Sequence, residues 1–316
     1  MTLRRIGNSG LQVSAVGLGC NNFGGRTDFE GSRKVVHKAL DLGITLFDTA
    51  DVYGENGGSE DYLGRILGER RKDIVLATKF GMEFAKNSVK KGAARRYIMM
   101  AVEDSLSRLK TDWIDLYQLH APDPLTPIEE TLRALDDLVR QGKVRYIGCS
   151  NLPAWEVVEA QWTSRLHNLE SFISCQDEYS LIRRGIVEKE LQAAMQKYAM
   201  GLLPFFPLAS GLLTGKYKRG AAAPAGTRFA TTQYLADRYR TDANWGIVEA
   251  LEAFCNQRGH SMLELAFSWL LARPCVSSVI AGATRPEQLE QNVKAAGWAL
   301  SAEDLAEIDR ITLPKA

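Results

Sequence analysis

Short apolar runs of strand length alternate along the chain with segments of helical period. The segments between its short apolar runs carry apolar residues three and four positions apart, as in the face formed by Ile128, Leu132 and Leu135, which is typical of amphipathic helices. Eight such strand and helix pairs follow one another without a linker, which predicts an α/β fold: one closed (β/α)8 TIM barrel, a single domain over residues 1–316. An open doubly wound sheet is the competing topology. The predicted strands are Ser14–Cys20, Ile44–Phe47, Asp73–Lys79, Trp113–His120, Val144–Ser150, Phe172–Gln176, Gly201–Phe206 and Val276–Gly282.

Three kinds of segment lie outside this repeat. Residues 3–14 hold turn residues between two short β-prone pieces, which predicts an N-terminal β-hairpin at the barrel floor. Residues 244–257 and 301–311 show helical spacing and predict two extra helices. Residues 209–242 are too long for a plain connection and predict a functional loop or lid.

Two capping boxes predict where helices begin. Thr126 is followed by Pro127 and Glu129, and Ser261 is followed by Glu264. A Ser or Thr three residues before a Glu can exchange hydrogen bonds with it at a helix start, and proline fits the first helical position.

Composition excludes several classes of partner. The 39 basic and 38 acidic residues give a formal charge of +1, and no basic run interleaved with aromatics occurs, so nucleic acid is not an expected partner. No run of about 18 apolar residues and no N-terminal signal core is present, so we expect no membrane contact and a cytoplasmic protein. The five cysteines are widely spaced without a Cys-x-x-Cys pair, so neither disulfides nor a metal site are expected.

Polar residues recur where the predicted strands end. In a parallel barrel these carboxyl ends form one rim, and their side chains converge on a common mouth. Buried polar groups destabilise a protein unless they find partners, so the recurrence indicates a site. The rim positions are Cys20, Asn21, Asp48, Lys79, His120, Ser150, Asn151, Gln176, Pro207, Gly282 and Thr284.

Four titratable residues on this rim, Asp48, Tyr53, Lys79 and His120, form a plausible proton donor. A tyrosine has an ordinary pKa of about 10, too high for ready proton exchange at neutral pH. The Lys79 ammonium would stabilise the phenolate and lower the pKa of Tyr53, while Asp48 would hold Lys79 in place. His120 could orient a substrate carbonyl. The set holds no strong nucleophile, which argues against hydrolysis.

Six motifs in the same order resemble those of the aldo-keto reductase family: "DTADVYG", "VLATKFG", "DLYQLH", "GKVRYIGCSN", "PLASGLLTGKY" and "IAGATRPEQLEQN". The resemblance is to the branch with bacterial reductases and the potassium channel β subunits. It implies NADPH-dependent reduction of a small aldehyde or ketone, with hydride transfer from the nicotinamide and proton donation from Tyr53. Asp48 and Lys79 would tune the tyrosine, and His120 would position the carbonyl oxygen.

The resemblance also implies the cofactor contacts. Ser150, Asn151 and Gln176 match the residues that hold the nicotinamide carboxamide, and Phe205 matches the aromatic ring that stacks on the nicotinamide. The remaining matches, from the first strand end, the long loop and the adenosine end, are Gly19, Cys20, Asn21, Asp48, Pro207, Leu208, Ser210, Gly211, Leu213, Lys216, Arg228, Gly282, Thr284, Arg285, Gln288, Gln291 and Asn292.

Physical reasoning supports a phosphate at the adenosine end. Thr284 with Glu287 has the pattern of an N-cap, so free backbone N–H groups and the positive helix end would meet a phosphate there. Arg285 offers a planar fork for the same group. NADPH is therefore expected over NADH.

Other functions remain open from the sequence. A short-chain dehydrogenase would need Tyr-x-x-x-Lys, which does not occur. An aldolase could form a Schiff base on Lys79, and a cofactor-binding sensory protein would share the scaffold of the channel β subunits. The helix faces alone do not reveal a partner surface, so the oligomeric state stays open and a homo-oligomer is possible.

Some residues have a simpler interpretation. Asp51 follows a strand, where aspartate commonly forms turns, and is interpreted as structural. Trp155, Trp162 and Trp269 fall on helix faces and are interpreted as packing residues.

Overall fold

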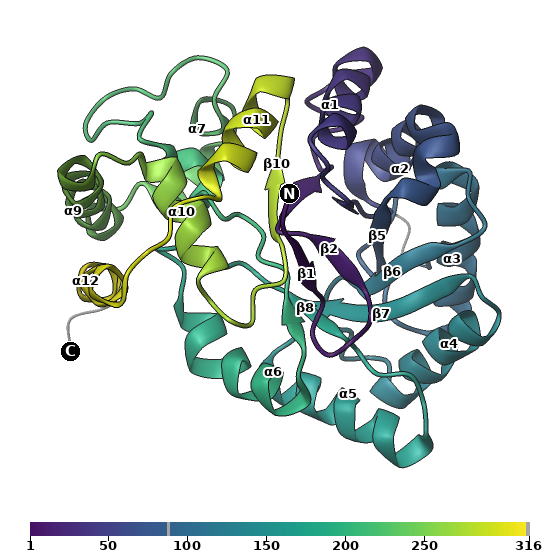
Figure 1. Cartoon of the computed structure of the whole chain (residues 1–316). Helices are drawn as coiled ribbons and strands as arrows, with labels where there is room; N and C mark the ends of the chain where they lie inside the picture. The colour runs from purple at the N-terminus through teal and green to yellow at the C-terminus, as the bar shows by residue number, and fades with distance from the viewer. Residues whose placement is uncertain (87–88, 314–316) are drawn as a thin grey trace.

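The computed structural model describes residues 1–86 and 89–313, and these form an eight-stranded parallel barrel surrounded by helices (Figure 1). Neighbours pair in the order β10, β3, β4, β5, β6, β7, β8, β9. Leu202 on β9 closes the sheet, because its N–H donates to the Cys275 carbonyl at 2.7 Å and its carbonyl accepts from Ser277 at 2.8 Å. The predicted barrel is confirmed. Its strands are β3 (Val16–Gly19), β4 (Leu46–Asp48), β5 (Val75–Phe80), β6 (Ile114–Leu119), β7 (Val144–Ser150), β8 (Ser174–Gln176), β9 (Gly201–Leu202) and β10 (Val279–Gly282).

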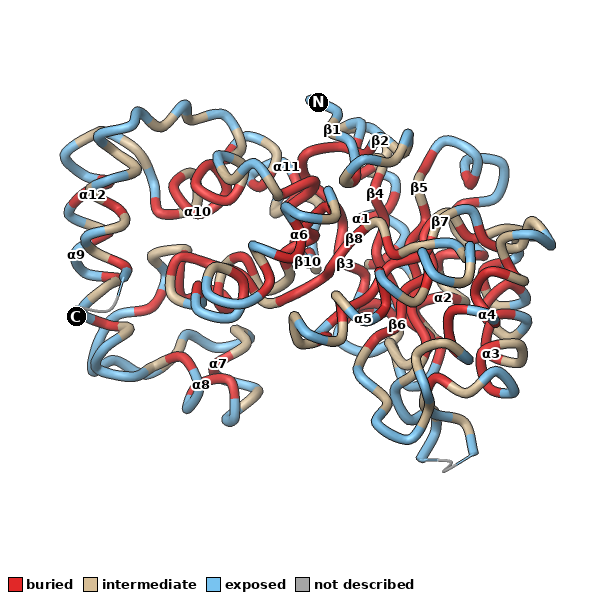
Figure 2. Tube along the Cα trace, turned by 90° about the horizontal axis from the view of Figure 1, so that it is seen from below, coloured by how far each residue is buried: buried red, intermediate tan, exposed pale blue. Residues whose placement is uncertain are grey.

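Each strand is followed by a helix that covers the barrel. Buried residues concentrate on the strands and the inner helix faces (Figure 2). No helix within residues 1–86 and 89–313 is long and apolar enough to cross a membrane. The covering helices are α1 (Phe29–Asp41), α2 (Tyr53–Leu67), α3 (Arg95–Leu109), α4 (Ile128–Arg140), α5 (Ala154–His167), α6 (Gln192–Tyr198), which the π-helix η2 (Ile186–Leu191) precedes, α10 (Met262–Leu271) and α11 (Pro286–Ala295).

The predicted elements outside the repeat are present. The two extra helices are α9 (Asp242–Arg258) and α12 (Ala302–Thr312). The long loop after β9 contains three short helices, η3 (Ala209–Thr214), α7 (Arg228–Thr231) and α8 (Gln233–Tyr239). A further short helix, η1 (Gly68–Asp73), leads into β5.

The N-terminal hairpin, purple in Figure 1, closes the amino end of the barrel. Its strands β1 (Leu3–Arg5) and β2 (Gln12–Ser14) pair antiparallel. The Asn8 N–H donates to the Ala199 carbonyl, just before β9 begins, at 2.8 Å. The rim where the strands end is therefore left open. Apolar side chains of the hairpin and the strands pack into one small cluster, made of Ile6, Val13, Leu46, Ala77, Leu116, Leu203 and Ile280.

One of the two predicted capping boxes is confirmed. The Ser261 hydroxyl accepts from the Glu264 N–H at 3.2 Å, and the Glu264 carboxylate accepts from the Ser261 N–H at 2.8 Å. The box at Thr126 is wrong, because its hydroxyl donates to the Asp123 carboxylate at 2.7 Å and Pro127 takes the N-cap position. A nearby acid has replaced the helix as the partner of this hydroxyl.

Two of the three tryptophans interpreted as packing residues lie on the surface. Trp269 is fully buried, but Trp155 and Trp162 on α5 are 66% and 58% exposed. The buried face of α5 is formed by smaller side chains such as Val157 and Ala160, so the indole rings lie on the opposite face.

Candidate active site

The carboxyl ends of β4 and β5 hold a fully buried ion pair. The ammonium Nζ of Lys79 contacts the two carboxylate oxygens of Asp48 at 2.8 and 2.7 Å. It donates a third hydrogen bond to the Thr49 carbonyl at 2.9 Å. Lys79 is 0% exposed, so these three acceptors replace water around the ammonium. This geometry keeps a positive charge in place at the barrel mouth.

The Tyr53 ring lies against this ammonium, and His120 lies against Tyr53. Lys79 Nζ is 5.1 Å from the centroid of the Tyr53 ring. The His120 ring meets the Tyr53 ring edge to face, with centroids 5.7 Å apart and planes at 80°. The structure thus brings together the phenol, ammonium, carboxylate and imidazole that the sequence placed on one rim.

A strained turn places Tyr53 over the mouth. Residues 54–57 all have positive φ, so the regular helix begins only after this turn. A Cβ on Gly54 would lie 2.2 Å from the Phe23 carbonyl oxygen and 2.6 Å from the Ser59 nitrogen. Glycine is therefore required directly after Tyr53 by both conformation and space.

We expect Gly54→Ala to destabilise the protein by more than about 2 kcal/mol and to reduce activity, because the Tyr53 turn must move. Gly246→Ala is the matched control, since Gly246 lies in α9 with nothing near its Cβ position. The control should be neutral or stabilising by about 0.4–1 kcal/mol. Chemical denaturation of both variants measures the difference, and equal midpoints would contradict the strain argument.

The ionisation of the site follows from its burial. Burial raises the pKa of Tyr53, and the Lys79 charge opposes this rise without cancelling it. The predicted lowering effect of Lys79 on the tyrosine pKa is present, but burial outweighs it. Burial lowers the pKa of Lys79, but Asp48 and Tyr53 outweigh it and the pKa is raised. Burial and the Lys79 charge lower the pKa of His120 to about 3, so the imidazole is neutral at physiological pH.

Two amides complete the surroundings of Asp48. The side-chain N–H groups of Gln176 and Gln118 donate to the Asp48 Oδ1 at 2.8 and 3.3 Å. Sequence reasoning missed Gln118. The signal for it was its position two residues before His120, because alternate residues of a strand point to the same face.

The residues matched to the carboxamide contacts lie side by side at the ends of β7 and β8. The Ser150 hydroxyl donates to the Gln176 carbonyl at 2.7 Å. The Asn151 amide donates to the Ser150 hydroxyl at 2.9 Å and to the His120 carbonyl at 3.0 Å. Phe205 lies just beyond β9 and its ring is partly exposed. An amide-bearing ring would meet hydrogen-bonding groups and an aromatic face here.

A group of cations lies on the loops of the same rim. Burial lowers the pKa of Lys216, and the charges of Arg228, Arg26 and Arg285 lower it further. Like charges destabilise one another, so a cluster drawn from three separate loops indicates an anionic ligand. Arg228 also donates to Asn22 at 3.3 Å, which links the long loop after β9 to the β3 loop. Sequence reasoning missed Arg26, which has no periodic signal.

The short helix η3, which begins the long loop, adds a buried donor beside these cations. The Ser210 hydroxyl is buried and has no hydrogen-bond partner within the described ranges. Gly211 has φ 96°, and a Cβ there would lie 2.7 Å from Lys216 Nζ. A free hydroxyl, a close-packed glycine and an ammonium fit the phosphate groups of a dinucleotide.

The predicted N-cap at Thr284 is wrong. Arg285 occupies the N-cap position of α11 instead. The Thr284 N–H and hydroxyl donate to the Gln288 amide oxygen at 2.8 and 3.3 Å, so this threonine is bound to a side chain of the first helical turn and does not cap the helix. Arg285 is exposed at the helix start, where its guanidinium can reach an anion.

The other residues predicted for the cofactor lie at the ends of β3 and β10, in the long loop after β9 and on α11. Gly282 ends β10, and a Cβ there would lie 3.0 Å from the Asn22 amide, so the β3 and β10 ends approach closely. The remaining positions are Gly19, Cys20 and Asn21 at the end of β3, Pro207, Leu208 and Leu213 in the long loop, and Gln291 and Asn292 on α11.

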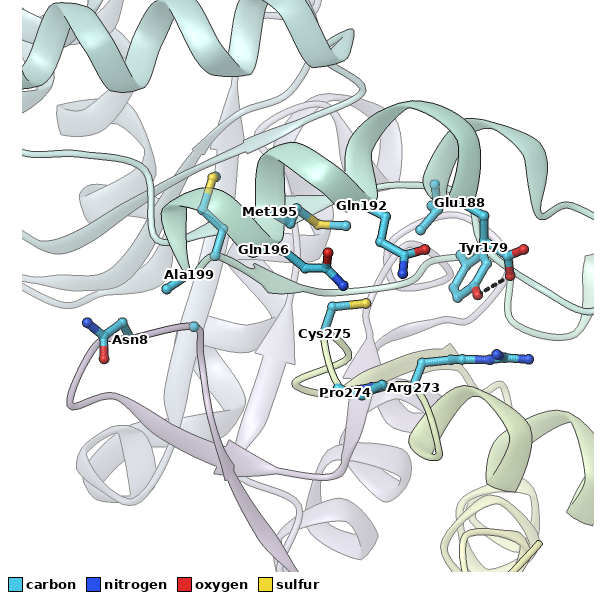
Figure 3. A pocket seen from close by; sticks show the side chains of 13 residues that line it. Asn8, Tyr179, Glu188, Gln192, Met195, Gln196, Ala199, Arg273, Pro274 and Cys275 are labelled. Carbon is cyan, nitrogen blue, oxygen red and sulfur yellow. Dashed lines mark hydrogen bonds between the residues drawn. The ribbon is translucent and has the colours of Figure 1, made fainter. Parts of the chain in front are cut away.

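A cavity of about 430 Å³ lies at the opposite end of the barrel (Figure 3). The hairpin residue Asn8, Met195 on α6 and Cys275 contribute to its lining. Its walls carry a hydrogen bond of 2.6 Å from the Tyr179 hydroxyl to Glu188. None of the rim residues named above lines it, so the candidate site is defined by its chemistry and not by this cavity.

Comparison with known proteins decides the family. The model of the aldo/keto reductase family matches residues 15–312. The chain belongs to the aldo/keto reductase family. It is an oxidoreductase, and aldo/keto reductases act on small carbonyl compounds with a nicotinamide cofactor.

Individual relatives lie in the branch expected from the motifs. A probable voltage-gated potassium channel subunit beta of Oryza sativa subsp. japonica is 37% identical over 93% of this chain and 91% of its own. The L-glyceraldehyde 3-phosphate reductase of Escherichia coli (strain K12) is 36% identical over 98% and 92%. The oxidoreductase YrpG of Bacillus subtilis (strain 168) is 35% identical over 97% and 94%. Both kinds of aldo/keto reductase relative, channel subunit and enzyme, are thus equally similar to this chain.

Proposed function

We propose that this aldo/keto reductase uses NADPH to reduce an aldehyde or ketone to the alcohol, with Tyr53 as the proton donor. The observation that carries the proposal is the buried Lys79 ammonium, which Asp48 holds at 2.7 Å and the Tyr53 ring covers. The bound nicotinamide supplies a hydride to the carbonyl carbon. The chain supplies the proton and the orientation.

Each member of the catalytic group has a separate task. The Tyr53 hydroxyl gives its proton to the carbonyl oxygen, and the nearby Lys79 charge stabilises the phenolate that remains. His120 is neutral, so it acts by hydrogen bonding to the carbonyl and not as an acid. The hydrogen bonds of Gln118 and Gln176 keep the Asp48 carboxylate oriented toward the ammonium.

The cofactor would be held at both ends by the rim residues described above. Ser150, Asn151 and Gln176 would bind the carboxamide, and the Phe205 ring would stack on the nicotinamide. Ser210, Gly211, Lys216, Arg26 and Arg228 would receive the pyrophosphate, and Arg285 the phosphate of the adenosine end.

Arg285→Ala should weaken NADPH binding by about tenfold or more and change NADH binding little, because only NADPH carries the additional phosphate. The control is Arg310→Ala, which removes an exposed arginine from α12. Fluorescence titrations with both cofactors measure the two dissociation constants. Equal losses for NADPH and NADH would contradict the assignment of Arg285.

Turnover is the test of the proposed function. The purified protein should oxidise NADPH in the presence of small aldehydes, dicarbonyls or ketones, and the alcohol product should appear in equal amount. The names of the plant relatives favour a second candidate, a cofactor-binding regulatory subunit with little turnover. Tight NADPH binding without oxidation across the whole panel would support that candidate. Borohydride trapping of a substrate on Lys79 would instead indicate a Schiff-base enzyme.

A further inference from the structure

A second buried polar cluster lies behind β5, on the face of the strand opposite to Lys79. Successive strand residues point to opposite faces, so Thr78 faces the helices. Its hydroxyl donates to the Glu60 carboxylate on α2 at 2.6 Å. The other oxygen of Glu60, which is fully buried, accepts from Arg108 on α3 at 2.7 Å. The cluster ties β5 to both covering helices.

Asp51 connects this cluster to the turn that carries Tyr53. Its N–H donates to the Lys79 carbonyl at 3.1 Å, and its Oδ2 accepts from the Tyr97 hydroxyl of α3 at 3.1 Å. The Tyr53 N–H donates to the Ala50 carbonyl at 3.1 Å, so Asp51 lies inside the turn. Asp51 is 1% exposed, and its Oδ1 is buried without a hydrogen-bond partner among the residues described. A carboxyl group in this position is not explained by its turn alone.

The charges around Asp51 connect its ionisation to Tyr53. Burial, and next the Glu60 carboxylate, raise the pKa of Asp51 to about 7, against the opposing effects of Tyr97 and Arg108. The Asp51 charge in turn raises the pKa of Tyr53, opposite to the effect of Lys79. The titratable and charged groups that act on Asp51 or are acted on by it are Tyr53 and Glu60 from α2, Tyr97 and Arg108 from α3, and Tyr117 from β6.

We propose that Asp51 is a positioning residue for proton donation: it fastens the Tyr53 turn to α3, and its negative charge favours the protonated form of the Tyr53 hydroxyl. The inference rests on the proposed function, because it assigns a role to a residue behind the same site. At alkaline pH the charged Asp51 counteracts Lys79, so the tyrosine keeps the proton that it must give to the substrate. Lys79 stabilises the phenolate, and the Asp51 charge adds to the effect of burial in opposing it.

Asp51→Asn separates the charge from the shape, because the amide oxygen can still accept from Tyr97. We expect the alkaline limb of the kcat profile to move to lower pH by about half a unit, with NADPH affinity unchanged within about twofold. Asp136→Asn is the matched control. Asp136 is also buried, but its carboxylate contacts Arg140 at 2.6 Å and the Glu170 N–H at 2.9 Å, away from the rim. The control should leave the limb in place.

A second readout needs no turnover. Tyrosine labelled in the ring reports its own titration by NMR, and the signal absent from Tyr53→Phe belongs to Tyr53. Its midpoint should be lower in Asp51→Asn than in the parent. An identical midpoint and an identical kcat limb would overturn the proposal. A shifted midpoint in a protein that never reduces a carbonyl would leave the role of Asp51 standing and overturn the proposed function instead.

Tyr97→Phe removes the hydrogen bond that fastens the Tyr53 turn to α3 and keeps the Asp51 carboxylate. Loss of the 3.1 Å hydrogen bond should let the Tyr53 turn move, so kcat should fall by about tenfold while the alkaline limb does not move to lower pH. An unchanged kcat would contradict the anchoring role. This variant also keeps the proposal testable if Asp51→Asn does not fold.

Discussion

Replacing Tyr53 with phenylalanine should lower kcat for carbonyl reduction by about 10²–10⁴-fold and leave NADPH affinity within about twofold. The substitution removes only the hydroxyl, so the ring remains over the Lys79 ammonium, now 5.1 Å from its centroid. His120 cannot replace it as the acid, because with a pKa of about 3 the imidazole is neutral near physiological pH. The measurement is steady-state NADPH oxidation together with cofactor titration.

Tyr62→Phe is the control for this experiment. Tyr62 also belongs to α2, but its ring packs against Phe29 at 5.3 Å, outside the catalytic group. It should retain the parental kcat. If Tyr53→Phe turned over carbonyl compounds at the parental rate, the proton would have to come from elsewhere, and the assignment of Tyr53 would fail.

Most of the fold could be predicted because both faces of a barrel strand are buried. Strands such as β3 (Val16–Gly19), whose residues are all buried, therefore appear in the sequence as parts of short apolar runs, and the segments between the strands show the helical period. The hairpin was predictable from its turn residues, and the extra helices α9 and α12 from their helical spacing. Periodicity does not tell which helix face is inward when the buried face carries small residues such as Val157 and Ala160, and so Trp155 and Trp162 were assigned wrongly to packing.

Local capping patterns were less informative than the strand pattern. Ser261 forms its box because Glu264 is free to reach it. Thr126 and Thr284 have the same pattern, but Asp123 and Gln288 supply partners that the spacing does not reveal. The side chain of a Ser or Thr before a helix can bind the helix N–H groups or another side chain nearby. Only the three-dimensional structure shows which of these partners is within hydrogen-bonding distance.

The catalytic group could be located from sequence because its members end successive strands of one barrel. The sign of the Tyr53 pKa shift could not be predicted, since it depends on how deeply the phenol is buried and the sequence does not give that depth. Asp51 illustrates the same limit. Its position after a strand indicated a turn, whereas its contact with Tyr97 depends on how α3 packs on the barrel.

Lys79→Met should be the most destructive single change in stability and activity together. It leaves the Asp48 carboxylate buried without its cation, which should lower the free energy of unfolding by about 3–5 kcal/mol. The loss of the positive charge also raises the pKa of Tyr53 further, because Lys79 is what opposes the effect of burial. Proton donation should then slow by about 10²-fold or more, and the alkaline limb of the kcat profile should move to higher pH.

The double variant Asp48→Asn, Lys79→Met distinguishes the two effects of this change. It removes the unpaired charge, so most of the lost stability should return, but kcat should stay as low as in the single variant because the phenolate still lacks its ammonium. The control is Lys218→Met, which breaks an exposed pair with Glu252 of 3.2 Å and should change stability by less than about 1 kcal/mol. Urea unfolding and steady-state kinetics on the same four proteins give both quantities. Recovery of activity together with stability would mean that Lys79 only holds the barrel mouth together and takes no part in proton donation.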